Sequence, residues 1–180
     1  MTQTDAMLSE IGAQVPRVEV TLRRSAIQGR IVGAEATSFP AVAGMFDWMA
    51  NFPHEALFTV SLDVANRIRH FAQVATGGSA GISVSPAEVL RPAFLTNSRG
   101  IILIHNHPHG DPRPSPQDIE FTRRMRRACR SLGICLHEHL VIGWSGFFCR
   151  VCRQIDRGEE TVWRASSIAP PEGRHRPVNP

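Results

Sequence analysis

The chain has 180 residues, of which 42% are hydrophobic and 20% are charged, a composition typical of a single globular domain. All 20 basic residues are arginine, and the absence of lysine excludes Schiff-base chemistry, a pyridoxal-phosphate lysine and a phosphate-binding-loop lysine. The net charge of +4 permits an acidic partner but does not require one.

Two features of the chain argue against a membrane or secreted protein. No apolar run approaches the ~18 to 20 residues of a transmembrane helix, and the first residues lack a basic segment followed by an apolar one. We therefore expect no membrane contact and a cytoplasmic location. We also expect an ordered domain over 17–163, between a flexible tail over 1–16 and a proline-rich, disordered tail over 164–180.

The first half of the chain is predicted to contain three strands and one helix. Residues 17–22 alternate between polar and apolar side chains and predict a strand. Ser38, with a proline in the turn that follows it, predicts the start of a helix that ends near Pro53. Residues 55–64 predict a strand whose hairpin partner is 68–75. One face of the strand over 55–64 is predicted to carry Ala56, Phe58, Val60, Leu62 and Val64.

The second half of the chain is predicted to alternate between helices and strands. Ser85 and Glu88 form a capping box that opens a helix. The predicted elements are a helix from Ser85 to about Thr96, a strand over 100–105, a helix from Ser115 to near Gly133, and strands over 134–142 and 146–151. This mixed order predicts an α/β fold with a mixed sheet and hairpins, not a doubly wound sheet.

The segment from 101 to 119 carries the clearest functional signal. His105 and His107 end an apolar strand, and because they are two residues apart they face the same side of it. Asp118 returns from the next helix as a third ligand for one ion. Three protein ligands leave the open position that distinguishes catalytic zinc sites from structural ones. The alternative is a pair of loop histidines bonded to the backbone.

Ser115 and Asp118 also have structural interpretations. Ser115 can be a helix N-cap, and Asp118 can stabilise the first turn through the helix dipole. However, Asp118 is predicted to share a helix face with Phe121, Met125 and Leu132. A carboxylate that projects inward beside core residues needs a partner, and a metal ion is a suitable one.

Glu55 is the best candidate for a general base. It begins a strand, and zinc chemistry needs a carboxylate that takes a proton from the activated water. The alternative is a solvated glutamate at a strand end. Glu88 competes for the role, but the capping box already explains it.

The other histidines are interpreted as non-ligands. His109 follows a proline in a loop rich in glycine and proline, beside the predicted site. His137 and His139 lie in a predicted strand, and we expect sheet or surface positions for them instead of a second metal site.

The four cysteines are expected to be free thiols. Cys149 and Cys152 form a lone C-x-x-C, and no second pair completes a four-ligand site. We therefore expect buried core thiols instead of a metal or redox pair.

A basic surface follows Asp118 on the same helix. Such a surface is usually solvated, but it can also contact nucleic acid phosphates or an acidic protein. Its members are Arg123, Arg124, Arg126, Arg127 and Arg130.

At these residues the sequence resembles the JAMM, or MPN-type, metalloprotease family. The family pattern is an upstream glutamate followed by H-x-H-x7-S-x2-D, and here its positions are Glu55, His105, His107, Ser115 and Asp118. The block HNHPHGDPRPSPQDIEFTRRM resembles the bacterial RadC branch more closely. The resemblance covers roughly Arg17 to Arg153.

The resemblance implies an MPN (JAB) fold, with a curved mixed β-sheet flanked by helices in a cytidine-deaminase-like architecture. It implies one Zn²⁺ held by His105, His107 and Asp118. It further implies Glu55 as the base and Ser115 as the group that stabilises the oxyanion, in isopeptidase-like chemistry. Relatives in this branch are named for DNA repair.

Three functions remain open from the sequence. The first is a zinc metallopeptidase that hydrolyses a peptide or isopeptide bond in a protein or peptide substrate. The second is a DNA-associated MPN-fold module, from repair or a mobile element, that binds nucleic acid through its arginine-rich helix. The third, a zinc nucleobase deaminase, needs P-C-x-x-C, whereas Cys149 follows Phe148. The sequence carries no signal for an oligomeric state.

Overall fold

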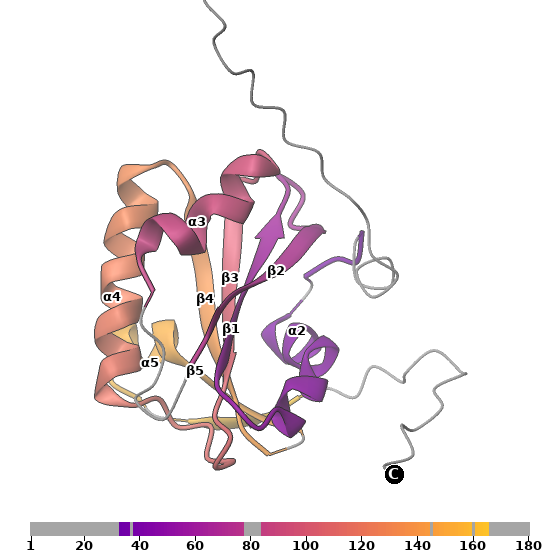
Figure 1. Cartoon of the computed structure of the whole chain (residues 1–180), viewed down its shortest axis with the longest axis vertical. Coiled ribbons are helices and arrows are strands. Elements are labelled where there is room, and N and C mark those ends of the chain that lie inside the picture. The colour runs from indigo at the N-terminus through magenta and orange to yellow at the C-terminus, as the bar shows by residue number, and fades with distance from the viewer. Residues whose placement is uncertain (1–32, 37, 78–83, 145, 160, 166–180) are drawn as a thin grey trace, which may run out of the picture.

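A computed structural model places the strands of the described residues in one mixed sheet, in the order β2-β1-β3-β4-β5-β6 (Figure 1). The structure describes residues 33–36, 38–77, 84–144, 146–159 and 161–165. The strands are β1 (Ala56–Leu62), β2 (Ile68–Thr76), β3 (Gly100–Asn106), β4 (Cys135–Ile142), β5 (Phe147–Arg150) and β6 (Val162–Arg164). The helices are α2 (Phe39–Met45), the 3-10 helix η2 (Asp47–Asn51), α3 (Pro86–Leu95), α4 (Pro116–Ser131) and α5 (Val151–Arg157).

The strand pairings confirm a mixed sheet. β1 is antiparallel to both β2 and β3, whereas β3 and β4 are parallel. Parallel neighbours need a crossover connection, which is α4 here. β5 and β6 then extend the sheet in antiparallel fashion.

Helices cover both faces of the sheet. α2 and η2 lie on one face, and α3, α4 and α5 lie on the other (Figure 1). Because both faces are covered, every residue of β1 and of β3 is buried. Burial of a large apolar side chain contributes roughly 1.5–3 kcal/mol, so this double cover fixes the central strands firmly.

The apolar cores on the two faces of the sheet differ in character. The α2 side contains an aromatic cluster in which the ring centroids of Phe46 and Phe71 are 5.3 Å apart. The α3–α4 side is aliphatic and includes Leu57, Leu103 and Met125. The polar site described below lies on the α4 side, at the carboxyl end of β3.

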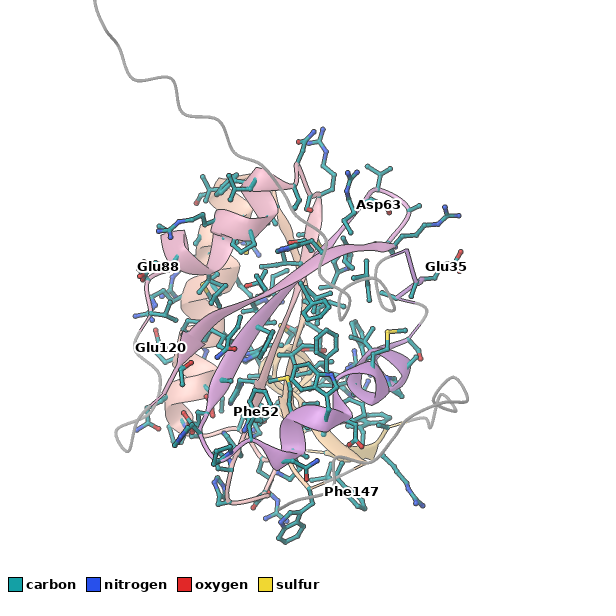
Figure 2. The ribbon with its side chains drawn as sticks, turned by 45° about the vertical axis from the view of Figure 1, so that its right-hand side comes forward. Glu35, Phe52, Asp63, Glu88, Glu120 and Phe147 are labelled. Carbon is teal, nitrogen blue, oxygen red and sulfur yellow. The ribbon has the colours of Figure 1, made fainter. Side chains whose placement is uncertain are left out.

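The predicted capping box of α3 is confirmed. The side chain of Ser85 accepts a hydrogen bond from the backbone N–H of Glu88, and the Glu88 carboxylate accepts one from the backbone N–H of Ser85. Figure 2 shows Glu88 and Glu120 at the outer surface of the α3 and α4 side. Glu88 therefore has a structural role.

Three predicted details are wrong. The strand over 55–64 ends at Leu62, because the Asp63 carboxylate accepts the N–H groups of Ala65 and Arg67 in a turn, which leaves Val64 exposed. The helix that begins at Ser38 is broken after Met45 into α2 and η2. Leu132 lies beyond the end of α4 and is exposed. The buried side chains of α4 are instead Thr122, Met125 and Cys129.

α5 and β6 were not predicted, and the predicted strand over 146–151 becomes helical at Val151. The predicted strand over 17–22, the tail over 1–16 and the last residues of the C-terminal tail lie outside the described residues.

A buried ion pair explains where α5 begins. Glu138 of β4 is 1% exposed, and its Oε2 accepts the Nε–H of Arg150 at 3.0 Å. Its Oε1 accepts the backbone N–H groups of Cys152 at 2.7 Å and of His139 at 3.0 Å. Arg150, at the N-cap of α5, offers no capping side chain. A carboxylate from β4 therefore takes over the capping role.

Candidate metal centre

The carboxyl end of β3 and the first turn of α4 meet at one end of the sheet (Figure 1). β3 delivers His105 and Asn106, and His107 follows directly. Gly110 turns the connecting loop at a φ of +90°, and its N–H donates to the carbonyl of His107. A Cβ at Gly110 would overlap the indole of Trp144, so this loop needs glycine for two reasons.

The three side chains that the sequence predicts as ligands come together. His105 Nε2 and His107 Nε2 are 3.1 Å apart. Asp118 Oδ1 lies 3.2 Å from His105 Nε2, and Asp118 Oδ2 lies 3.4 Å from His107 Nε2. In a tetrahedral zinc site with ligand atoms ~2.0–2.1 Å from the ion, neighbouring ligand atoms are roughly 3.3 Å apart. One ligand atom from each of the three residues lies within 4.8 Å of the others, and the closest contacts are near that spacing, so these residues can hold a metal ion.

The outer nitrogen of His107 supports this interpretation. His107 Nδ1 lies 2.7 Å from the carbonyl oxygen of Asp111. A carbonyl only accepts, so Nδ1 carries the hydrogen of the neutral ring and Nε2 presents a lone pair. Lone pairs and a carboxylate that converge on one point need a proton or a cation between them.

Asp118 combines the predicted structural role with a place in the cluster. Its Oδ2 accepts the N–H and the hydroxyl of Ser115, both at 2.7 Å, and Ser115 Oγ accepts the Asp118 N–H at 3.2 Å. Burial favours a higher pKa for this carboxyl. The adjacent imidazoles of His105 and His107, together with the hydrogen bond from Ser115, outweigh burial and hold the pKa of Asp118 well below its usual value. The side chain therefore remains an anion.

The pKa of His107 moves in the opposite direction. Burial lowers it, but the hydrogen bonds to Asp118 and to the Asp111 carbonyl, with the charges of Asp118 and Glu55, raise it above the ordinary value. In the absence of a metal ion, a proton on His107 between the imidazole and the Asp118 carboxylate is thus favoured. Binding of a metal ion by these residues would therefore release protons.

Glu55 lies next to the cluster, at the foot of β1. Leu57 pairs with His105 across the antiparallel ladder, and Glu55 lies two residues before Leu57, just outside β1. It is close enough for its charge to raise the pKa of His107. The side chain is partly exposed. Within the described residues, it has no hydrogen bond to the three clustered side chains.

Asn106 is a site residue that the sequence reasoning missed. It is fully buried between the two histidines, and its Oδ1 accepts the backbone N–H of Ala56 at 2.8 Å. Its Nδ2 donates to the carbonyl of His54 at 3.0 Å. These bonds hold the backbone on both sides of Glu55. An amide at the centre of an H-x-H pattern was the available signal.

His139 and Thr122 were also missed. His139 Nε2 lies 2.8 Å from His105 Nδ1, and His139 Nδ1 lies 2.7 Å from Thr122 Oγ1. His139 is a sheet residue as predicted, but it is buried and in contact with the candidate site. Burial, with the neighbouring charge of His105, lowers the pKa of His139 well below its usual value.

His109 and His137 lie outside the metal-binding group. His109 is exposed, and its ring stacks on that of His107 with centroids 4.9 Å apart. His137 is half-buried beside Gly100. Neither belongs to the one group of potential ligands found among the described residues.

The basic surface on α4 is partly neutralised. Arg126 pairs with Asp156 at 2.7 Å, and Glu120 lies within 4.0 Å of both Arg123 and Arg127. Arg124 packs its guanidinium over the ring of Phe121.

None of the four cysteines forms a disulfide among the described residues, in agreement with the prediction. Cys129, Cys149 and Cys152 are buried, whereas Cys135 is exposed. Burial raises the pKa of Cys129 to about 11, and burial together with the charge of Glu138 raises the pKa of Cys152 above its ordinary value. Buried, protonated thiols of this kind are inert in redox chemistry.

Comparisons with known proteins point to one family. The profile of a family described as "RadC-like JAB domain" matches residues 36–153. A UPF0758 protein of Streptococcus thermophilus is 40% identical over 96 residues, which are 53% of this chain and 42% of that protein. A UPF0758 protein of Ruegeria pomeroyi is 42% identical over 97 residues, or 54% and 43% of the two chains. One from Trichlorobacter lovleyi is 39% identical over 114 residues, or 61% and 50%.

The chain therefore spans about half the length, or less, of the curated relatives it matches. Their names state neither an activity nor a ligand. In the part of the chain that the structure describes, no helix combines the length and the apolar character needed to cross a membrane.

Proposed function

The chain belongs to the RadC-like JAB domain family, and from this premise we propose that it is a zinc-dependent hydrolase of peptide or isopeptide bonds. The observation that carries the proposal is the convergence of His105, His107 and Asp118, whose nitrogen and oxygen atoms make contacts of 3.1 to 3.4 Å. Two imidazoles and one carboxylate suit zinc better than they suit calcium or magnesium, which prefer oxygen ligands.

A zinc ion bound by these three residues would lower the pKa of a water molecule toward ~7 and polarise the scissile carbonyl. The protein then has to move one proton and stabilise one negative charge. The base proposed for the proton is Glu55, because it lies just before β1, whose Leu57 pairs with His105, and its charge acts on His107. The Asn106 bonds to the backbone on either side keep that carboxylate in place. A positioned base of this kind contributes typically ~10²–10⁴-fold to the rate.

Ser115 is the proposed donor to the oxyanion. Its hydroxyl donates to Asp118 Oδ2 in this structure, as does its backbone N–H. The backbone bond can keep Asp118 in place while the hydroxyl rotates toward a substrate oxygen. Loss of one such donor typically costs ~10²–10³ in rate.

Metal analysis and peptide cleavage together test this proposal. Purified wild type is expected to hold one zinc per chain, measured beside iron and manganese by mass spectrometry. His107→Ala and Asp118→Ala are expected to lose the metal. Glu55→Gln is the matched control, because it should keep zinc but lose cleavage of linear and isopeptide-linked fluorogenic peptides. A wild type without stoichiometric zinc, even after refolding with Zn²⁺, would overturn the proposal.

Nucleic acid binding, in repair or otherwise, is a second proposal with less support. Three of the five arginines on α4 have a carboxylate neighbour, which reduces the charge available for phosphates. DNA binding whose salt dependence disappears on changing Arg124 and Arg130 to glutamine would favour it.

A further inference from the structure

A chain of short hydrogen bonds runs from α4 to the back of the candidate metal site. Thr122 is fully buried, one helical turn after Asp118. Its hydroxyl lies 2.6 Å from the carbonyl oxygen of Asp118 and 2.7 Å from His139 Nδ1. His139, 1% exposed, continues the chain to His105 Nδ1 at 2.8 Å. Threonine is not a strong helix former, so its burial within a helix calls for another reason.

The chemistry of the partners sets the direction of every bond in this chain. A carbonyl only accepts, so the single hydroxyl hydrogen of Thr122 points to Asp118. Thr122 Oγ1 must then accept the hydrogen on His139 Nδ1. A neutral imidazole carries one hydrogen, which leaves His139 Nε2 as an acceptor. His105 therefore donates through Nδ1, and its Nε2 presents a bare lone pair toward His107 and Asp118.

We propose that Thr122 and His139 are positioning residues that fix the tautomer of His105 and so determine that Nε2 is its metal-binding atom. This inference rests on the metal site of the proposed function. Asp118 and Thr122 lie at positions i and i+4 of α4, so one helix supplies both a ligand and the origin of the chain that orients another ligand.

The opposite direction of the chain is unfavourable. It would turn the Thr122 hydroxyl toward His139 and leave two oxygens, Thr122 Oγ1 and the Asp118 carbonyl, 2.6 Å apart without a hydrogen between them. It would also place the hydrogen of His105 on Nε2, which blocks the atom that faces the other ligands. The closely packed interior gives the rings little space to rotate away.

Two variants of one residue test the proposal. Thr122→Val keeps the branched shape but removes the hydroxyl, and Thr122→Ser keeps the hydroxyl. Without an acceptor, the buried N–H of His139 favours the other nitrogen, which reverses the chain. Competition with a chromophoric chelator should show about 10–100-fold weaker Zn²⁺ binding for Thr122→Val, the range typical of groups that orient metal ligands. Thr122→Ser should bind Zn²⁺ as the wild type does.

A second readout does not depend on the metal. Imidazole ¹⁵N chemical shifts of the zinc-free wild type, in mildly alkaline buffer, should place the hydrogens of His105 and His139 on Nδ1. Hydrogen on Nε2 of His105 would overturn the proposal even if Thr122→Val does not fold. So would equal Zn²⁺ affinity in folded Thr122→Val and Thr122→Ser. If the wild type binds no Zn²⁺ at all, the proposed function fails instead, and the ¹⁵N shifts still decide the direction of the chain.

Discussion

Glu138 and His139 are neighbours on β4, yet they belong to two polar clusters of opposite character. The carboxylate of Glu138 is saturated by one guanidinium and two backbone N–H groups. His139 contacts a cluster in which His105 Nε2, His107 Nε2 and the Asp118 carboxylate face one another and need a proton or a cation between them. Both clusters are largely shielded from water, so burial alone does not distinguish them.

The difference shows how a structural charge can be separated from a binding site. A buried carboxylate with a full set of partners completes the fold, because desolvation is offset inside the protein. A buried set of lone pairs that face one another is incomplete without a ligand. Changes at the first cluster, around Glu138, should therefore alter stability. Changes at the second cluster, around His105, His107 and Asp118, should alter metal binding.

Glu138→Ala gives the largest expected effect. Removing this carboxylate leaves the Arg150 charge and the Cys152 N–H without their partner, which should lower the free energy of unfolding by about 3 kcal/mol. Urea denaturation measures the loss, and Glu138→Gln, which keeps an acceptor, should lose less. Zinc stoichiometry of the folded protein should not change. Loss of zinc together with stability would mean that the two clusters are one unit.

A weaker effect is expected from removal of the metal. With free Zn²⁺ at 100 times its Kd, the wild type should gain about 2.7 kcal/mol over the chelated protein. Asp118→Asn, similar in shape, should show no gain from Zn²⁺. Thermal unfolding with Zn²⁺ or with a chelator measures both, and an equal response of the two proteins would contradict the assignment of the second cluster.

Asn106 provides a third test. Its side chain is saturated by backbone partners, as that of Glu138 is, but it lies between two of the candidate metal ligands. Asn106→Ala leaves the buried N–H of Ala56 without an acceptor, and such a group costs about 1–3 kcal/mol. Hydrogen exchange of the Ala56 amide should become faster, while one zinc per chain is retained. A variant that loses zinc but keeps its slow exchange would show that Asn106 serves the ligands and not the strand of Glu55.

The smallest effect concerns the exposed thiol of Cys135. Cys135 is the exposed cysteine, so Cys135→Ser should change the free energy of unfolding by less than about 0.5 kcal/mol. The folded wild type should react with one equivalent of a thiol reagent, and the Cys135→Ser variant with none until it unfolds. Rapid labelling of Cys152 in the folded variant would contradict its burial.

The sequence was sufficient for most of the fold because the decisive signals were local. The capping boxes at Ser85 and Ser115 fixed two helix starts, and the apolar runs of β1 and β3 fixed the central strands. α5 could not be predicted in this way, because its capping group is Glu138, which lies on another strand.

The candidate site shows the same difference between local and long-range signals. His105, His107 and Asp118 lie close together in the sequence at a recognisable spacing, and the structure brings them together. The contact of His139 with His105 depends on the parallel pairing of β3 and β4, which no local pattern encodes. The roles of Glu55 and Ser115 stay predictions.

The three clustered side chains come from one continuous segment, residues 105–118. The entropy of closing a loop of that length is modest and grows only logarithmically with length. The three candidate ligands therefore come together once the end of β3 meets the first turn of α4. Glu55 and His139 belong to other segments of the chain. Zn²⁺ present during synthesis could thus act as a folding nucleus that joins this strand to this helix before the sheet is complete.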